Sequence, residues 1–218
     1  MTTVIWPQRE TDAAPAVPIG RQLRTWTGAV AMVALFVLIA VTSAIDPVDS
    51  NASSKAQLAQ AKAHSAALQS TIALEFLIAL CAIGAVFAIV GAVGGRGMVL
   101  ANIAAVVGAF GILGQTLIPV GHVMLLAVAR SGASADVIDQ FHMSAPPFTA
   151  VFLFAMPVAL VLLAGAAWRA RIVGWLPFAL VALFFVLDLV GLPEEIAAVI
   201  GLVGFALIAI GLVRRPGL

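Results

Sequence analysis

Apolar residues lie along the chain in long blocks that short polar segments separate. Each block comes close to, or exceeds, the roughly 20 residues that a helix needs to cross the hydrocarbon core of a bilayer. The pattern therefore predicts an all-α polytopic membrane protein, a bundle of six transmembrane helices within one membrane domain, residues 21–218. The predicted helices cover residues 25–45, 71–93, 98–129, 147–168, 172–190 and 196–213.

Two of the blocks depart from a simple crossing helix. The block 98–129 is too long for one straight crossing at about 1.5 Å per residue. Gly114, Pro119 and Gly121 are places where it can bend, so we expect a bent block, a crossing helix followed by an interfacial segment. The block 25–45 resembles a signal peptide, but its apolar stretch exceeds the usual 7 to 15 residues, which favours a retained signal anchor.

The polar segments predict local structure outside the bilayer. Residues 1–20 show no apolar periodicity and are expected to form a disordered cytoplasmic tail. Residues 51–70 lack Gly and Pro, and Ser53 offers an N-cap, so a polar helix is expected there. Four placements of this polar helix stay open: it caps the bundle, lies on the membrane, extends the second span outward, or contacts a partner. Ser134 begins a second short amphipathic helix in the segment 130–144, as a lid or a connector.

Composition excludes several classes of protein. The chain is 63% hydrophobic and 10% charged, whereas soluble domains are about a quarter charged, so a soluble fold is excluded. A formal net charge of +1 without a long run of like charges excludes nucleic acid as the defining partner. The expected partners are membrane lipid and either a membrane protein or a second copy of the chain. Abundant Ala, Val, Leu and Gly, with no Tyr, indicates a GC-rich bacterial source.

Basic residues assign an orientation, because cytoplasmic loops carry the excess of Lys and Arg. With six spans, one side of the membrane carries eight of the eleven basic residues and the other side carries three. The eight are Arg9, Arg21, Arg24, Arg96, Arg169, Arg171, Arg214 and Arg215, and the three are Lys55, Lys62 and Arg130. The expected localisation is the bacterial plasma (inner) membrane, multi-pass, with both termini in the cytoplasm.

Few ionisable or strongly polar residues fall within the apolar blocks, and such residues are functional candidates because they are costly in hydrocarbon. They are Glu75, Gln115, His122 and Asp188, all toward the outer leaflet. Gln115 and His122 lie on one helical face if the helix continues through Pro119. We therefore expect a polar cluster at the outer leaflet that binds a ligand, with His142, Glu194 and Glu195 as rim residues.

Motifs for known membrane chemistries are absent from the sequence. No HExxH or GxSxG pattern occurs, so zinc hydrolysis and serine hydrolysis are not expected. A bis-histidine haem would have only His122 and His142 as ligands, and we expect neither haem nor a metal. The lone Cys81 is expected to be a small buried hydrophobic residue. Gly108, Gly111 and Gly114 permit a close approach of neighbouring helices.

Four short motifs carry a resemblance to other membrane proteins. They are Leu74-Glu75-Phe76-Leu77, Gly95-Arg96, Ala167-Trp168-Arg169-Ala170-Arg171 and Gly174-Trp175-Leu176-Pro177. With them the chain resembles uncharacterised six-span integral membrane proteins of high-GC bacteria. The resemblance implies the six-span fold and no particular activity.

Three functions stay open on the sequence. The leading hypothesis is a non-enzymatic inner-membrane protein that binds a small or lipid-like ligand, or a partner protein, at the outer-leaflet polar face. The second is a small transporter or proton-coupled carrier that uses Glu75 and Asp188. The third is a membrane-embedded enzyme of lipid or redox chemistry that uses His122.

Overall fold

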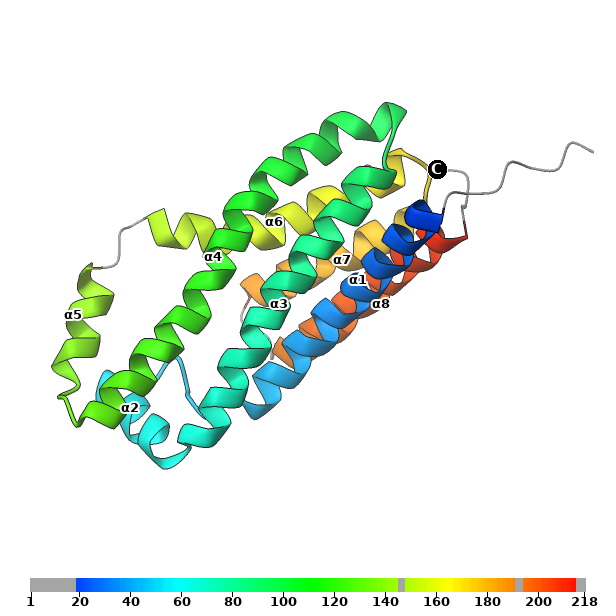
Figure 1. Cartoon of the computed structure of the whole chain (residues 1–218). Coiled ribbons are helices and arrows are strands. Elements are labelled where there is room, and N and C mark those ends of the chain that lie inside the picture. Colours follow the sequence, from blue (N-terminus) through cyan, green and yellow to red (C-terminus); the bar gives the residue numbers. More distant parts are fainter. Residues whose placement is uncertain (1–18, 145–147, 191–193, 215–218) are drawn as a thin grey trace, which may run out of the picture.

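The protein is all-helical. The computed structural model describes residues 19–144, 148–190 and 194–214, and no strand occurs in these ranges (Figure 1). The long helices are α1 (Ile19–Ile45), α3 (Ser65–Ala92), α4 (Met98–Ser131), α6 (Phe148–Arg169), α7 (Trp175–Leu189) and α8 (Glu194–Val213). The short ones are α2 (Ser54–Ala63), α5 (Asp136–Ser144) and a 3₁₀ turn, η1 (Gly95–Gly97), between α3 and α4. The predicted all-α class is confirmed.

The long helices pack in the order in which they follow one another along the chain. The main contacts join α1 to α3, α3 to α4, α4 to α6, α6 to α7 and α7 to α8, and α8 returns to α1. The arrangement is therefore a closed ring of antiparallel neighbours. In Figure 1 the start of α1 and the end of α8 lie together at one end of the helix bundle, which we call the terminal end. The short helices α2 and α5 lie at the opposite end, which we call the α2–α5 end.

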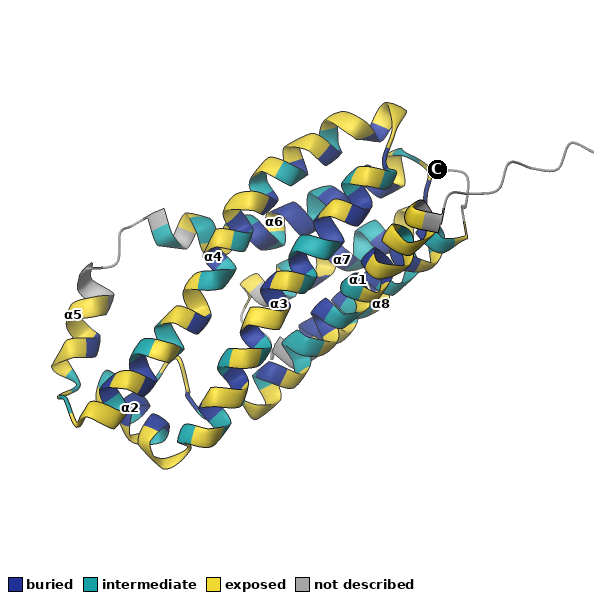
Figure 2. Cartoon of the chain, in the orientation of Figure 1, coloured by how far each residue is buried: buried dark blue, intermediate teal, exposed yellow. Residues whose placement is uncertain are grey.

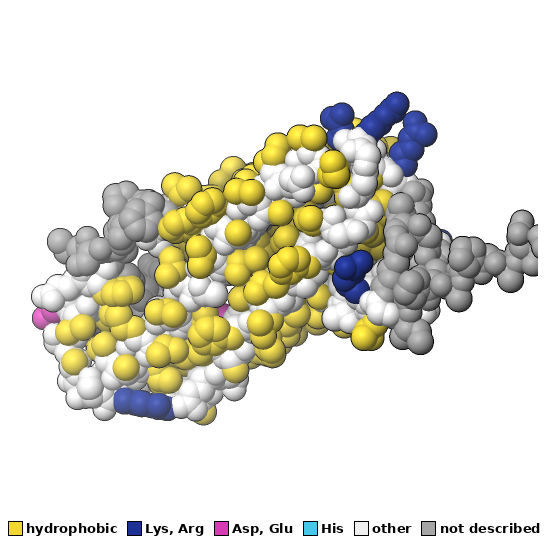
Figure 3. All heavy atoms as spheres, turned by 45° about the horizontal axis from the view of Figure 1, so that its top comes forward, with side chains coloured by type: hydrophobic (Ala, Val, Ile, Leu, Met, Phe, Trp, Pro, Cys, Tyr) yellow, Lys and Arg dark blue, Asp and Glu magenta, His cyan; other side chains and the backbone are white. Residues whose placement is uncertain are grey.

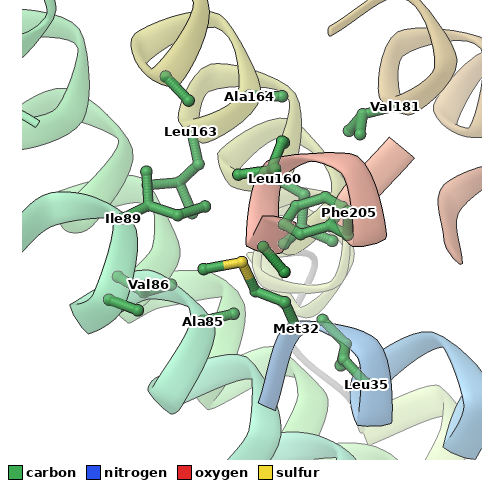
Figure 4. Packing of buried hydrophobic residues seen from close by; sticks show 14 of the residues in the cluster. Met32, Leu35, Ala85, Val86, Ile89, Leu160, Leu163, Ala164, Val181 and Phe205 are labelled. Carbon is green, nitrogen blue, oxygen red and sulfur yellow. The ribbon is translucent and has the colours of Figure 1, made fainter. Parts of the chain in front are cut away.

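The core fills the middle of this ring. Met32 of α1, Ile89 of α3, Leu163 of α6 and Phe205 of α8 are fully buried, and Figure 4 shows their side chains grouped between the helices. The ring of Phe36 lies 5.0 Å from that of Phe205, so aromatic contact adds to burial where α1 and α8 meet. Such pairs contribute about 0.5–1.5 kcal/mol beyond their buried area.

Glycines set the distance between several helix pairs. A Cβ on Gly111 would lie 2.5 Å from the backbone of Met156, and one on Gly114 would overlap the backbone of Phe152. Between α1 and α3, a Cβ on Gly28 would overlap the methyl group of Ala88. The α4–α6 and α1–α3 contacts therefore require glycine, as expected for membrane helices that associate through close packing.

Five of the described helical segments are long and apolar enough to cross a membrane, and α7 is a shorter apolar helix. Exposed positions occur along these helices (Figure 2). Many of them carry large apolar side chains, such as those of Phe87 and Val99. In Figure 3 hydrophobic side chains cover the middle of the visible face, and the Lys and Arg side chains lie toward its two ends. The chain is a multi-pass helical membrane protein.

The helices match the sequence prediction closely, with three differences. The polar segment 51–70 forms α2 and the start of α3 with a break at His64, whose backbone leaves the helical region. The block 98–129 is one uninterrupted helix through Pro119, because a proline removes a single N–H and α3 contacts both halves, at Gly108 and at His122. The apolar block 172–190 forms a helix of only 15 residues, since the turn between α6 and α7, in which Arg171 has a positive φ of 58°, includes the first three residues of the block. Most of the predicted tail, residues 1–18, lies outside the described residues.

Candidate functional site at the α2–α5 end

A cavity of about 310 Å³ lies between α1, α3, α4 and α6, toward the α2–α5 end. Much of its wall is apolar, with Leu35, Ile78, Met156 and Leu160 among the lining residues. The polar lining residues come from α1, the segment after it, α3 and α4. They are Thr42, Ser43, Asp46, Ser50, Glu75, Gln115 and His122. The cavity thus combines apolar walls with one group of polar side chains.

Glu75 and His122 form the centre of this group. They come from the neighbouring helices α3 and α4, 47 positions apart in sequence. The Nδ1 atom of His122 lies 2.9 Å from Oε1 and 3.1 Å from Oε2 of Glu75. Glu75 is buried, with 8% of its surface exposed, so the imidazole supplies the partner that a carboxyl group within an apolar bundle requires.

Asp46 adds a second carboxyl group on the other side of the imidazole. Its Oδ2 atom lies 3.9 Å from Nε2 of His122, and its Oδ1 atom accepts a hydrogen bond of 3.0 Å from the backbone N–H of Val48. Asp46 directly follows α1, where the chain is no longer helical. His122 therefore presents each of its ring nitrogens to a carboxyl group.

The segment after α1 is held in place by α2. Gln57 of α2 is buried, and its amide donates hydrogen bonds of 3.1 Å to the carbonyl of Ser50 and 3.0 Å to that of Ala52. The N–H of Asp49 in turn donates to the side chain of Gln60. Ser53 caps α2 through the N–H of Ala56, which confirms the predicted cap. The short helix therefore positions the segment that carries Asp46.

Two threonine hydroxyls close to the group are buried and lack a hydrogen-bond partner among the described residues. Thr42 lies one turn before Asp46 and lines the cavity, with 7% of its surface exposed. Thr71 lies one turn before Glu75 and is fully buried. Unsatisfied buried polar atoms are uncommon in folded proteins and call for an explanation.

A second cavity, of about 610 Å³, adjoins the first on the side of α5. Ile138 and Phe141 of α5 and Leu153 of α6 line it. Both cavities include Val48, Ser50, Ile118 and His122 in their walls. His122 therefore borders both spaces, so the α5 side offers a route toward the polar group.

The structure brings together three of the residues that the sequence singled out. Glu75, Gln115 and His122 line one cavity, and the shared face of Gln115 and His122 is maintained through Pro119. Asp188 and His142 lie in α7 and α5, but their side chains are outside the described residues, as are those of Glu194 and Glu195. Their place in the cluster stays a prediction.

Asp46 is the residue that sequence reasoning missed. Asp46 lies one residue beyond the predicted span 25–45, so the criterion of an ionisable residue within an apolar block does not select it. The available signal was positional, because Asp46 follows the predicted first span directly and so lies at the membrane depth at which Glu75 enters the second.

The three groups Asp46, Glu75 and His122 have the composition of a cation site. Each offers one donor atom, and these atoms all lie within 4.8 Å of one another. The lining residues described for the cavity include no Lys or Arg. Acidic groups therefore dominate the electrostatics of the cavity.

Comparisons with protein-family models, with curated proteins and with solved structures found no match for this chain. The resemblance to six-span bacterial membrane proteins stays a prediction. Function therefore has to be argued from the site itself.

Proposed function

We propose that the chain is a six-span protein of the bacterial plasma membrane with both termini in the cytoplasm. The start of α1 and the end of α8 lie together, which supports an even number of crossings (Figure 1). The α7 helix, with 15 residues, would be about 22 Å long. A helix shorter than the bilayer core is accommodated by local thinning of the bilayer. The α2–α5 end, with the polar group, then faces the extracytoplasmic side.

Within this topology the protein is a ligand-binding protein, and its ligand carries a positive charge. The observation that carries the proposal is the pair of carboxyl groups, Asp46 and Glu75, in a cavity whose described lining includes one imidazole and no Lys or Arg. Charges in a low-dielectric site interact strongly, so a cation is favoured there and an anion is repelled. A volume of about 310 Å³ limits the ligand to a small one.

The proposal is tested with two probes that differ in the sign of their charge. Hexylammonium and hexanoate are titrated separately into the protein in lipid nanodiscs, and the thermal unfolding temperature is measured. Hexylammonium is expected to raise this temperature in a saturable way, because a ligand that binds only the folded state stabilises it. Hexanoate is expected to leave it unchanged.

The matched variants keep the net charge equal. Asp46→Asn/Glu75→Gln removes both carboxyl groups of the cavity, and the response to hexylammonium should be lost. Asp49→Asn/Asp136→Asn removes two exposed carboxyl groups from the same end of the molecule, and the response should persist. Equal responses to the two probes, or an equal loss in both double variants, would refute the proposal.

A further inference from the structure

We infer that Asp46, Glu75 and His122 together bind one divalent transition-metal ion of the zinc type. This inference rests on the proposed function and names the class of cation. The Nδ1–Oε1 separation of 2.9 Å and the upper limit of 4.8 Å bracket the spacing of donor atoms in a metal shell. With metal–ligand bonds of about 2.0–2.2 Å, neighbouring donors lie roughly 3–3.5 Å apart.

The donor types select the class of ion. One imidazole nitrogen and two carboxylate oxygens suit zinc and its first-row neighbours. Calcium and magnesium prefer shells made of oxygen alone, and copper(I) prefers sulfur. The one cysteine of the chain, Cys81, is not among the lining residues of the cavity. Three protein ligands leave a further position for water or for a second molecule.

The site can close without moving a helix. Glu75 and His122 lie on two packed helices and already touch. Asp46 lies on the non-helical segment after α1, and its Oδ2 atom faces the other ring nitrogen, Nε2, at 3.9 Å. One ion binds through a single ring nitrogen, so a turn of the imidazole or of this segment has to bring both carboxyl groups to that nitrogen, and donor atoms within 4.8 Å of one another are close enough for such an adjustment.

The Thr42 hydroxyl is an independent observation in the same cavity. It is nine-tenths buried and has no partner among the described residues. A water molecule bound to a metal ion donates hydrogen bonds strongly, and a buried hydroxyl oxygen can accept one. A hydrated ion would therefore satisfy a polar atom that the helices themselves leave without a bond.

The experiment measures metal binding directly. The full chain in nanodiscs is treated with a chelator, the chelator is removed, and Zn²⁺ is titrated calorimetrically. Co²⁺ is used as an optical probe because its visible spectrum reports its ligands. The wild type is expected to bind one equivalent of Zn²⁺. Asp46→Asn, Glu75→Gln and His122→Gln are each expected to weaken binding by at least about tenfold.

Matched controls lie outside the cavity. His64→Gln removes an exposed histidine, and Asp49→Asn removes an exposed carboxyl group three residues after Asp46. Both variants should bind Zn²⁺ as the wild type does. Unfolding temperatures without metal establish that each variant is folded. In the wild type Zn²⁺ should also raise this temperature, and in folded variants of the three ligands it should not.

The outcomes separate this inference from the proposed function. If hexylammonium binds and Zn²⁺ does not, the cavity is a site for organic cations and the metal site is refuted. If neither binds, both proposals are refuted. If Zn²⁺ binds equally well to the wild type and to the three ligand variants, the ion lies elsewhere and the inference is likewise refuted.

Discussion

His122 makes a different kind of contact with each of its two carboxyl neighbours. Its Nδ1 atom bonds to the buried Glu75, and its Nε2 atom faces Asp46 across 3.9 Å. The first contact has hydrogen-bond geometry and satisfies a carboxyl group that would otherwise be isolated in apolar surroundings. The second is too long for a hydrogen bond and leaves space between donors. At the scale of single residues, His122 therefore joins the two carboxyl groups of the cavity, one through a hydrogen bond and the other across a gap that a ligand can enter.

The contact between His122 and Glu75 can be tested by its effect on stability. His122→Ala leaves this buried carboxyl group without its partner, and we expect a loss of about 1–3 kcal/mol in the free energy of unfolding. Adding Glu75→Leu to His122→Ala should restore part of the loss, because no unpaired polar group then remains. The measurement is denaturant unfolding in mixed micelles, with His64→Ala as the control. A double variant less stable than His122→Ala would contradict this account.

The α4–α6 pair shows how elements hold the site. Gly111 and Gly114 bring α4 against the backbone of α6, and the cavity opens along the same pair, at Gln115, Ile118 and Met156. In lipid, helices associate through packing rather than through an apolar driving force, so the closeness of this contact sets the width of the cavity.

Glycine substitutions on α4 test this role of packing. Gly111→Ala places a Cβ 2.5 Å from the backbone of Met156, so the helices must separate. We expect destabilisation by about 1–3 kcal/mol, as for overpacked cores. Gly121→Ala lies on the same helix with nothing within 4 Å of its Cβ and should be neutral or slightly stabilising. Thermal unfolding in nanodiscs compares the two, and equal unfolding temperatures would refute the packing argument.

The whole molecule distributes its charges unevenly between its two ends. Arg24, Arg96, Arg169, Arg171 and Arg214 belong to helix ends and turns at the terminal end. The α2–α5 end carries acidic residues, among them Asp46, Asp49 and Asp136. By the positive-inside rule, this distribution favours the proposed orientation, in which the acidic cavity faces the extracytoplasmic side.

Cysteine labelling tests the proposed orientation without altering any charge. In a Cys81→Ala background, single cysteines replace Ala63, Ser134, Gly94 or Gly174, all of which are exposed. A membrane-impermeant maleimide applied to intact cells should label positions 63 and 134. Positions 94 and 174 should react only after the cells are permeabilised. The reverse pattern would contradict the orientation, and labelling of 94 and 174 on opposite sides would contradict the six-span topology.

The sequence alone determined the helices of this protein, because their causes are local. Apolar runs define where chain can lie in hydrocarbon, and the predicted ends agree with α3, α4, α6 and α8 within a few residues at most of their termini. Glu75 and His122 were also recognisable, since an ionisable residue within an apolar block stands out. The break at His64 and the short length of α7 could not be recognised from the sequence, because they depend on turn geometry rather than on hydrophobicity.

Only the tertiary structure decided which polar residues meet. Asp46, Glu75 and His122 belong to three different segments, so no spacing along the chain predicts their convergence. Their convergence depends on the packing of α1 against α3 and of α3 against α4, and on the hydrogen bond from Gln57 to the segment after α1. The helices follow from the cost of exposing polar backbone to lipid, which each segment meets by itself. The site follows from long-range packing, in which each residue depends on the positions of the others.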